Sequence, residues 1–141
     1  MKQGEAFKRL FAGMRADLHD YRDLRALLEA QFDAALHHRS AEICEVGERI
    51  TVLARMIERR REERVKLARR LVREPGSAPM TAIAERLQGV PRAAFETCWR
   101  SLEAIVSECK ALNLRNCRLL MDQHEVMQRV LNAEQDTYAP A

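Results

Sequence analysis

The most regular apolar pattern in the chain is found in FETCWRSLEAIVSECKALNLRNCRLLMDQHEVMQRV, residues 95–130. Its apolar and small residues recur in alternating steps of three and four, the spacing of a helix with one continuous face toward a neighbouring helix. We call this face the seam, and it predicts a helix over residues 92–134 that spans about 60 Å at ~1.5 Å per residue. The seam consists of Phe95, Cys98, Leu102, Ile105, Cys109, Leu112, Asn116, Leu119, Gln123, Val126 and Val130.

Two earlier segments repeat this spacing, which predicts helices over residues 4–37 and 41–73. Ser40 is placed to cap the second of them, because a serine oxygen accepts a hydrogen bond from a free N–H in the first turn. The apolar faces comprise Phe7, Leu10, Met14, Tyr21, Leu24, Leu28 and Ala35 in the first segment, and Ile43, Val46, Ile50, Leu53 and Ile57 in the second.

The remaining segments connect and end these helices. Pro75, Gly76, Ser77 and Pro79 predict a loop, because they combine a helix breaker with turn residues. A short helix is expected over residues 80–88, followed by the last long helix and a tail at residues 135–141.

We therefore expect a single all-α domain over residues 1–141. Only five glycines, four prolines and 5 % aromatic residues leave little material for a sheet protein. Short connections favour antiparallel packing of neighbouring helices. The predicted fold is an elongated antiparallel bundle of three long helices plus one short helix, with coiled-coil-like packing.

The charge pattern argues against a nucleic-acid-binding protein. The 24 basic and 21 acidic residues are interleaved and leave a net charge of only +3, without the basic face that a nucleic acid requires. The densest run is ERRREER, residues 58–64, which we interpret as a solvated stretch of helix stabilised by pairs three and four residues apart. The alternative, a contact to RNA or DNA, lacks interleaved aromatic residues.

Nothing in the sequence predicts an enzyme, a metal site or a bound cofactor. Glycine-rich phosphate loops and hydrolase motifs are absent, and the adjacent His37 and His38 point to different sides of a helix. No apolar run has the length of a membrane-spanning helix or the form of a signal peptide. The cysteines form no CxxC pair, so we expect reduced thiols in a cytoplasmic protein.

Asn113 and Asn116 stand out because asparagine is a poor helix former. Asn116 falls on the seam, where a buried asparagine sets helix register at a cost in stability. Alternatively, the seam from this point onward is not permanently covered. The Met-containing surface beyond Leu120, with Met121, Val126 and Met127, suits reversible docking of a partner's amphipathic helix. The residues alone leave both interpretations open.

The segment LNLRNCRLL, residues 112–120, resembles the L-N-x-x-N-G-x-L-L signature of FlgN-type flagellar export chaperones, with Cys117 in place of the usual glycine. In that family a helix of this length and then a tyrosine among small residues follow, and TYAPA supplies Tyr138. Trp99 matches an aromatic residue often found early in the last helix. The earlier helices fit the family pattern at Leu27, Leu28, Glu29, Ala35, Leu36, Ile43, Ile50, Leu53 and Ile57.

The resemblance implies a cytoplasmic chaperone of the flagellar type III secretion system. Such proteins bind the helical C-terminal segments of hook-associated junction proteins, prevent their polymerisation and bring them to the export apparatus with its gate and ATPase. Tyr138 is then expected to contact the export gate. The cargo site is expected at Leu119, Leu120, Val126, Met127, Val130 and Leu131.

A different class of protein remains as the alternative. A coiled-coil seam also serves proteins that associate with copies of themselves, so a self-associating structural coiled coil fits the same spacing. Neither possibility requires nucleic acid, membrane insertion, a metal or a cofactor.

Overall fold

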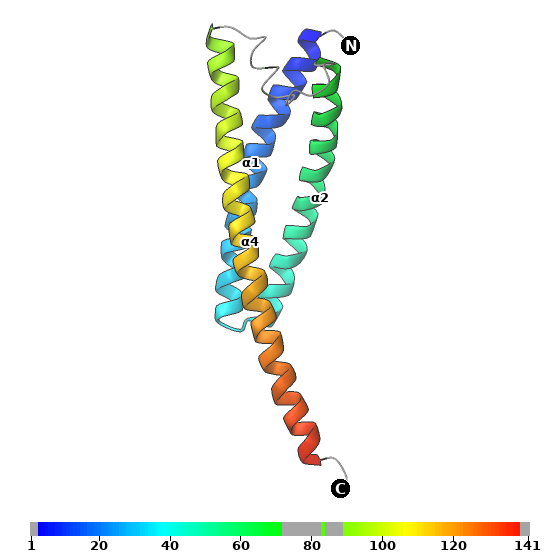
Figure 1. Cartoon of the computed structure of the whole chain (residues 1–141), viewed down its shortest axis with the longest axis vertical. Coiled ribbons are helices and arrows are strands. Elements are labelled where there is room, and N and C mark those ends of the chain that lie inside the picture. The colour runs from blue at the N-terminus through cyan, green and yellow to red at the C-terminus, as the bar shows by residue number, and fades with distance from the viewer. Residues whose placement is uncertain (1–2, 72–82, 84–88, 139–141) are drawn as a thin grey trace.

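The computed structural model describes residues 3–71, 83 and 89–138, with side chains up to residue 133. These residues form a bundle of three long helices and contain no strand: α1 (Gln3–Leu36), α2 (Ser40–Leu71) and α4 (Gly89–Tyr138), shown in Figure 1. The fold is therefore all-α. The short helix expected over residues 80–88 lies outside the described residues, except for Ile83.

The last helix is longer at both ends than its seam indicates. It begins at Gly89, three residues before the expected start, and continues to Tyr138, so that residues 135–138 are helical and not part of a tail. Gly89 has a φ of 67°, a left-handed conformation that favours glycine. Pro91 lies in the first turn, where its missing N–H removes no hydrogen bond.

A tight turn joins α1 to α2. His38 has a φ of 54°, and the backbone N–H groups of His38 and Arg39 donate to the carbonyls of Ala35 and Ala34, at 3.2 and 3.0 Å. This left-handed cap satisfies carbonyls that the end of a helix leaves free. The Arg39 guanidinium pairs with Asp33 across the turn at 3.4 Å. The turn holds α1 and α2 as an antiparallel hairpin.

Most residues of the buried core cluster come from α1 and α4, and these two helices run parallel (Figure 1). Asn116 bonds the carbonyl of Leu28, and Gln123 bonds that of Ala35, each pair 88 residues apart along the chain. Because the separation stays constant, the helices are parallel and in register. Consecutive helices run antiparallel as expected, and two such reversals make the first and the last long helix parallel.

The core runs along most of α1, from Leu10 to Leu28, and along α4 from Phe95 to Cys109. The ring of Phe95 packs against the rings of Phe7 and Phe11, with centroids 5.9 and 6.4 Å apart. Cys98 and Cys109 are buried, and burial raises the pKa of both thiols, so they act as small apolar residues. The buried core cluster contains Leu10, Met14, Leu28, Ala68, Ile83, Phe95, Cys98, Leu102, Ile105 and Cys109.

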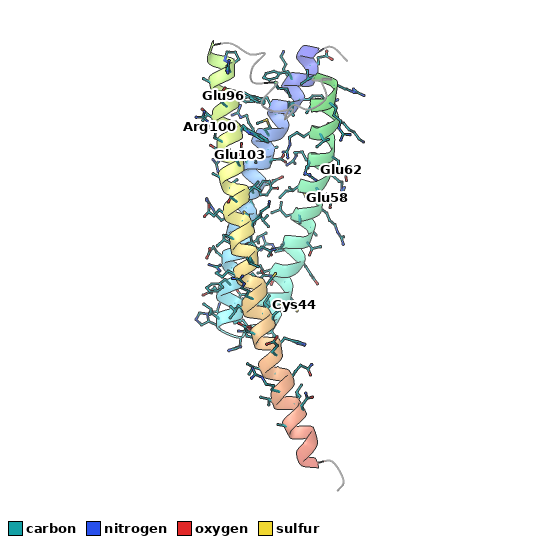
Figure 2. The ribbon with its side chains drawn as sticks, in the orientation of Figure 1. Cys44, Glu58, Glu62, Glu96, Arg100 and Glu103 are labelled. Carbon is teal, nitrogen blue, oxygen red and sulfur yellow. The ribbon has the colours of Figure 1, made fainter. Side chains whose placement is uncertain are left out.

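Helix α2 contacts α1 partly through a buried cluster of charges. Arg60 donates to Asp17 at 3.0 Å and to Asp20 at 2.5 Å, and Arg64 also pairs with Asp17. The Asp17 side chain is only 1 % exposed. Our interpretation of residues 58–64 as a solvated stretch is therefore wrong for these two arginines, although Glu58 and Glu62 are exposed (Figure 2).

The charges in this cluster respond differently to burial. Loss of hydration raises the pKa of the Asp17 carboxyl, against the lowering effect of Arg60 and Arg64. The hydrogen bonds that Arg60 donates to Asp20 and Asp17 raise the pKa of Arg60, whose side chain keeps more contact with water. The cost of burial therefore falls mainly on Asp17, and the cluster orients α2 on α1 more than it stabilises the bundle.

Candidate functional site

The C-terminal part of α4 extends beyond the α1–α2 turn (Figure 1). Gln123 is level with Ala35, whose carbonyl accepts a hydrogen bond from its side chain at 2.7 Å, and α1 ends at Leu36. We call residues 124–138 the overhang. Within its described side chains, four large apolar residues are 53–57 % exposed: Val126, Met127, Val130 and Leu131.

The overhang carries the continuation of the seam that α1 covers. From Phe95 to Gln123 the seam faces α1, and Val126 and Val130 occupy the next two positions in the same three- and four-residue steps. Residues with this spacing share one face of a helix. The overhang therefore presents an uncovered core surface, and not scattered exposed side chains.

The six residues expected to bind cargo lie in two different environments. Leu119 and Leu120 are half-buried in the last turns beside α1, whereas Val126, Met127, Val130 and Leu131 are exposed on the overhang. They form one stretch of α4, of which only the second part is freely accessible.

The two asparagines also differ in environment. Asn116 is 1 % exposed, and its amide group donates to the carbonyl of Leu28 at 2.7 Å and to the side chain of Gln31 at 2.9 Å. Its own oxygen accepts from Arg115 at 3.2 Å. Asn113 is exposed and its side-chain oxygen meets the Cys117 sulfur at 4.0 Å. Asn116 thus bonds α1 directly.

A protein-family model described as FlgN protein matches residues 1–138. The chain belongs to the FlgN family. FlgN proteins are flagellar export chaperones, and the chain is a member of that class. No curated protein and no solved structure matches the chain.

In this FlgN chain, the family tyrosine candidate, Tyr138, is the last residue of α4. The described side chains end at residue 133, so the structure places its backbone at the tip of the overhang and no contact of its ring. In the part of the chain that is described, no helix is long and apolar enough to cross a membrane.

Polar contacts beside the seam escaped the sequence analysis. Arg25 pairs with Glu108 at 3.0 Å, and the Arg115 guanidinium lies 3.7 Å from the centre of the Phe32 ring. Residues next to a coiled-coil seam often pair in this way. Once the offset of 88 between α1 and α4 is known, these pairs follow from the sequence, but the offset itself leaves no sequence signal.

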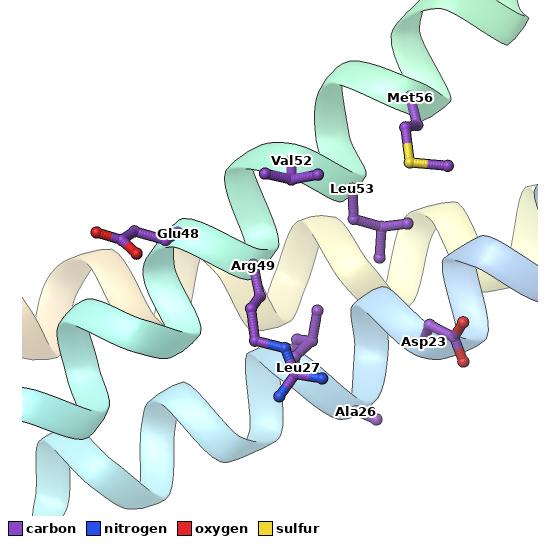
Figure 3. A pocket seen from close by; sticks show the side chains of 8 residues that line it. All are labelled: Asp23, Ala26, Leu27, Glu48, Arg49, Val52, Leu53 and Met56. Carbon is purple, nitrogen blue, oxygen red and sulfur yellow. The ribbon is translucent and has the colours of Figure 1, made fainter.

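The FlgN chain has a second exposed apolar region, on the hairpin. An open groove of about 730 Å³ runs between α1 and α2 and is lined by Leu27, Val52, Leu53 and Met56 with charged neighbours (Figure 3). On the surface of α1, His19, Asp20 and Asp23 lie close enough to share an ion, but such exposed acidic groups are common without one.

Proposed function

We propose that this FlgN protein is a cytoplasmic chaperone for hook-associated junction proteins. It binds their helical C-terminal segments on the overhang, keeps them from polymerising and delivers them to the flagellar export apparatus. The observation that carries the proposal is the exposed continuation of the α4 seam through Val126 and Val130.

Helical segments suit this surface for a physical reason. Proteins that polymerise through helices present apolar stripes, and a chaperone that offers a competing helical seam covers such a stripe. Complete burial of the half-exposed Val126, Met127, Val130 and Leu131 contributes roughly 1 kcal/mol each. Ordering of the cargo segment subtracts from that sum, so the affinity is moderate, which favours later release.

The test is a variant with Val126, Met127 and Val130 all replaced by glutamate. We expect loss of binding to a junction protein's C-terminal segment in calorimetry, because burial of three carboxylates is costly. Helix content is expected to stay unchanged in circular dichroism, since glutamate is a good helix former. Binding at wild-type affinity would place the cargo site elsewhere.

A matched control uses three residues of similar exposure outside the overhang. Val52, Met56 and Leu114 are 59 %, 45 % and 51 % exposed. Their replacement by glutamate introduces the same charge, and we expect cargo affinity to remain within about twofold of wild type, a change of less than ~0.5 kcal/mol. An equal loss in both triple variants would mean that net charge, and not the overhang, governs binding.

Delivery is tested separately with Tyr138→Ala. We expect the variant to bind cargo normally but to support less export of junction proteins in cells, because the tyrosine contacts the export gate. Export is measured as the amount of junction protein in the culture medium. Loss of cargo binding in the purified variant would instead make the tail part of the cargo site.

The same exposed surface favours one alternative, self-association of a structural coiled coil. That alternative requires a mass that rises with concentration in sedimentation equilibrium and falls to the monomer in the triple glutamate variant. A monomer at all concentrations, which forms a one-to-one complex with the cargo segment, would exclude it.

A further inference from the structure

We infer that the helix bound by the overhang runs parallel to α4, in line with α1, and forms the second strand of the coiled coil that α1 begins. This inference rests on the proposed function, since it specifies the orientation and chemistry of the cargo segment. The cargo helix then begins beside the α1–α2 turn and ends near the tip of the overhang.

The first argument is the geometry of the covered part. The seams of α1 and α4 face each other at a constant separation of 88 residues. Arg25 is level with residue 113 of α4, five residues beyond its partner Glu108. Phe32 is level with residue 120, five residues beyond Arg115. An offset of five between flanking residues is the pairing of parallel coiled coils, and these two contacts have it, while Arg115 also reaches Glu29, which is level with residue 117.

The second argument is that the overhang repeats these features without α1. Val126 and Val130 are the next seam positions, and Arg129 is the next flanking position after Glu108, Arg115 and Asp122, at seven-residue spacing. Arg129 is exposed and has no recorded ion pair among the described residues. In the same register, the cargo residue that faces Arg129 would be level with residue 134 of α4, five residues further along. We expect that cargo residue to be acidic, because it would pair with the Arg129 guanidinium.

The third argument concerns the end of α1. A helix C-terminus carries partial negative charge and an N-terminus partial positive charge. The turn already satisfies the last carbonyls of α1, so only the dipole acts here: a cargo helix in line with α1 and in the same direction brings its positive N-terminus toward the negative end of α1. The reverse direction brings two C-termini together, which is unfavourable.

A second copy of this chain does not fit this position as a parallel strand. In a parallel pair with matched overhangs, the copy's own α4 would enter the space that α1 occupies beside residues 95–123. In an antiparallel pair, Val126 of each chain can oppose Val130 of the other, but only these two layers overlap before α1 begins. The parallel strand therefore comes from a different protein with apolar residues at three- and four-residue steps.

The experiment measures the orientation of the junction protein's C-terminal segment, prepared as a ¹⁵N-labelled peptide, on the full chain. Exposed Cys44 and Cys117 are replaced by serine, while the buried Cys98 and Cys109 are kept. A nitroxide is then attached at His124→Cys or at Asn132→Cys; both sites are exposed and off the seam, about 12 Å apart at ~1.5 Å per residue. The affinity of each labelled chain is measured first as a control.

We expect the label at position 124 to broaden the peptide's N-terminal amide signals most and the label at position 132 its C-terminal ones. The reversed pattern would overturn the parallel orientation but leave the proposed function intact. Equal broadening of both ends from both labels would also overturn it, since the peptide then binds in both directions. Absence of binding to the unlabelled chain contradicts the proposed function and this inference together.

A charge exchange tests the predicted flanking pair. Arg129→Glu is expected to weaken the peptide's binding by about threefold, and a lysine in place of the peptide's acidic residue is expected to restore it. Arg118→Glu, on the exposed side away from the seam, is the control and is expected to leave affinity unchanged. Restoration by a lysine at a different peptide position would contradict the parallel register.

Discussion

The two parts of α4 have the same sequence pattern but opposite surroundings. Residues 95–123 pack against α1, and Phe95 is 1 % exposed, whereas Val130 on the overhang is 57 % exposed. Both lie on one seam with unbroken spacing. The difference shows that a seam predicts an apolar helix face that can pack against another helix. It does not predict whether that second helix belongs to the same chain.

Of the substitutions along α4, Phe95→Ala in the covered part is expected to lower the free energy of unfolding most. Loss of a buried phenylalanine lowers the free energy of unfolding by about 3–5 kcal/mol. The missing ring removes the contacts with Phe7 and Phe11 and leaves a cavity in their place. Denaturant unfolding followed by circular dichroism measures it. A loss below about 1 kcal/mol would mean that this end of the seam is not closely packed.

An intermediate effect is expected from Asn116→Ala, where the covered part ends. The substitution leaves the groups that Asn116 bonds on α1, the Leu28 carbonyl and the Gln31 side chain, without this partner, which costs about 2 kcal/mol of the free energy of unfolding. The control is Asn113→Ala, which changes an exposed side chain and is expected to cost under ~0.5 kcal/mol.

The cargo affinity of the Asn116→Ala variant shows whether this residue has a role besides stability. If Asn116 only fixes the register of the helices, the folded Asn116→Ala variant binds the cargo segment as wild type does in calorimetry. A drop in affinity larger than the drop seen for Asn113→Ala would show that Asn116 contacts cargo or shapes the overhang.

The smallest effect on stability is expected from Val130→Ala on the overhang. An exposed side chain contributes little to the fold, so the free energy of unfolding is expected to change by less than about 0.5 kcal/mol. Cargo affinity is expected to fall about fivefold, since the variant loses most of the roughly 1 kcal/mol that cargo gains by burying the half-exposed Val130 side chain. A large loss of stability would indicate that the overhang folds back onto the bundle.

Much of the bundle could be predicted, because the apolar spacing within each helix shows which of its faces is buried. The seam from Phe95 to Val130 marks the face of α4, and it correctly places Cys98 and Cys109 in the core. Helix ends were less certain, since Gly89 and Tyr138 extend α4 beyond its apolar pattern. The parallel direction of α1 and α4 follows from two successive antiparallel connections, but no spacing rule specifies the offset of 88 residues between them.

The charged contacts show a second reason for failure. Arg60 and Arg64 continue the three- and four-residue spacing of Ile57, so their position could have indicated an inward direction. We judged them by their charge, which normally places a side chain in water. Their acceptor, Asp17, lies on the apolar face of α1, between Met14 and Tyr21. Charged residues of opposite sign on the apolar faces of two helices are the sequence signal for a buried ion pair.

The constant separation of 88 residues between α1 and its partner in α4 has a consequence for synthesis. The apolar face of α1 leaves the ribosome long before the residues that cover it, a delay of roughly 4–18 s at ~5–20 residues per second. During that interval the α1–α2 hairpin can form, but Leu10, Met14 and Leu28 still lack α4. The newly made chain therefore exposes more apolar surface than the finished bundle until α4 is complete.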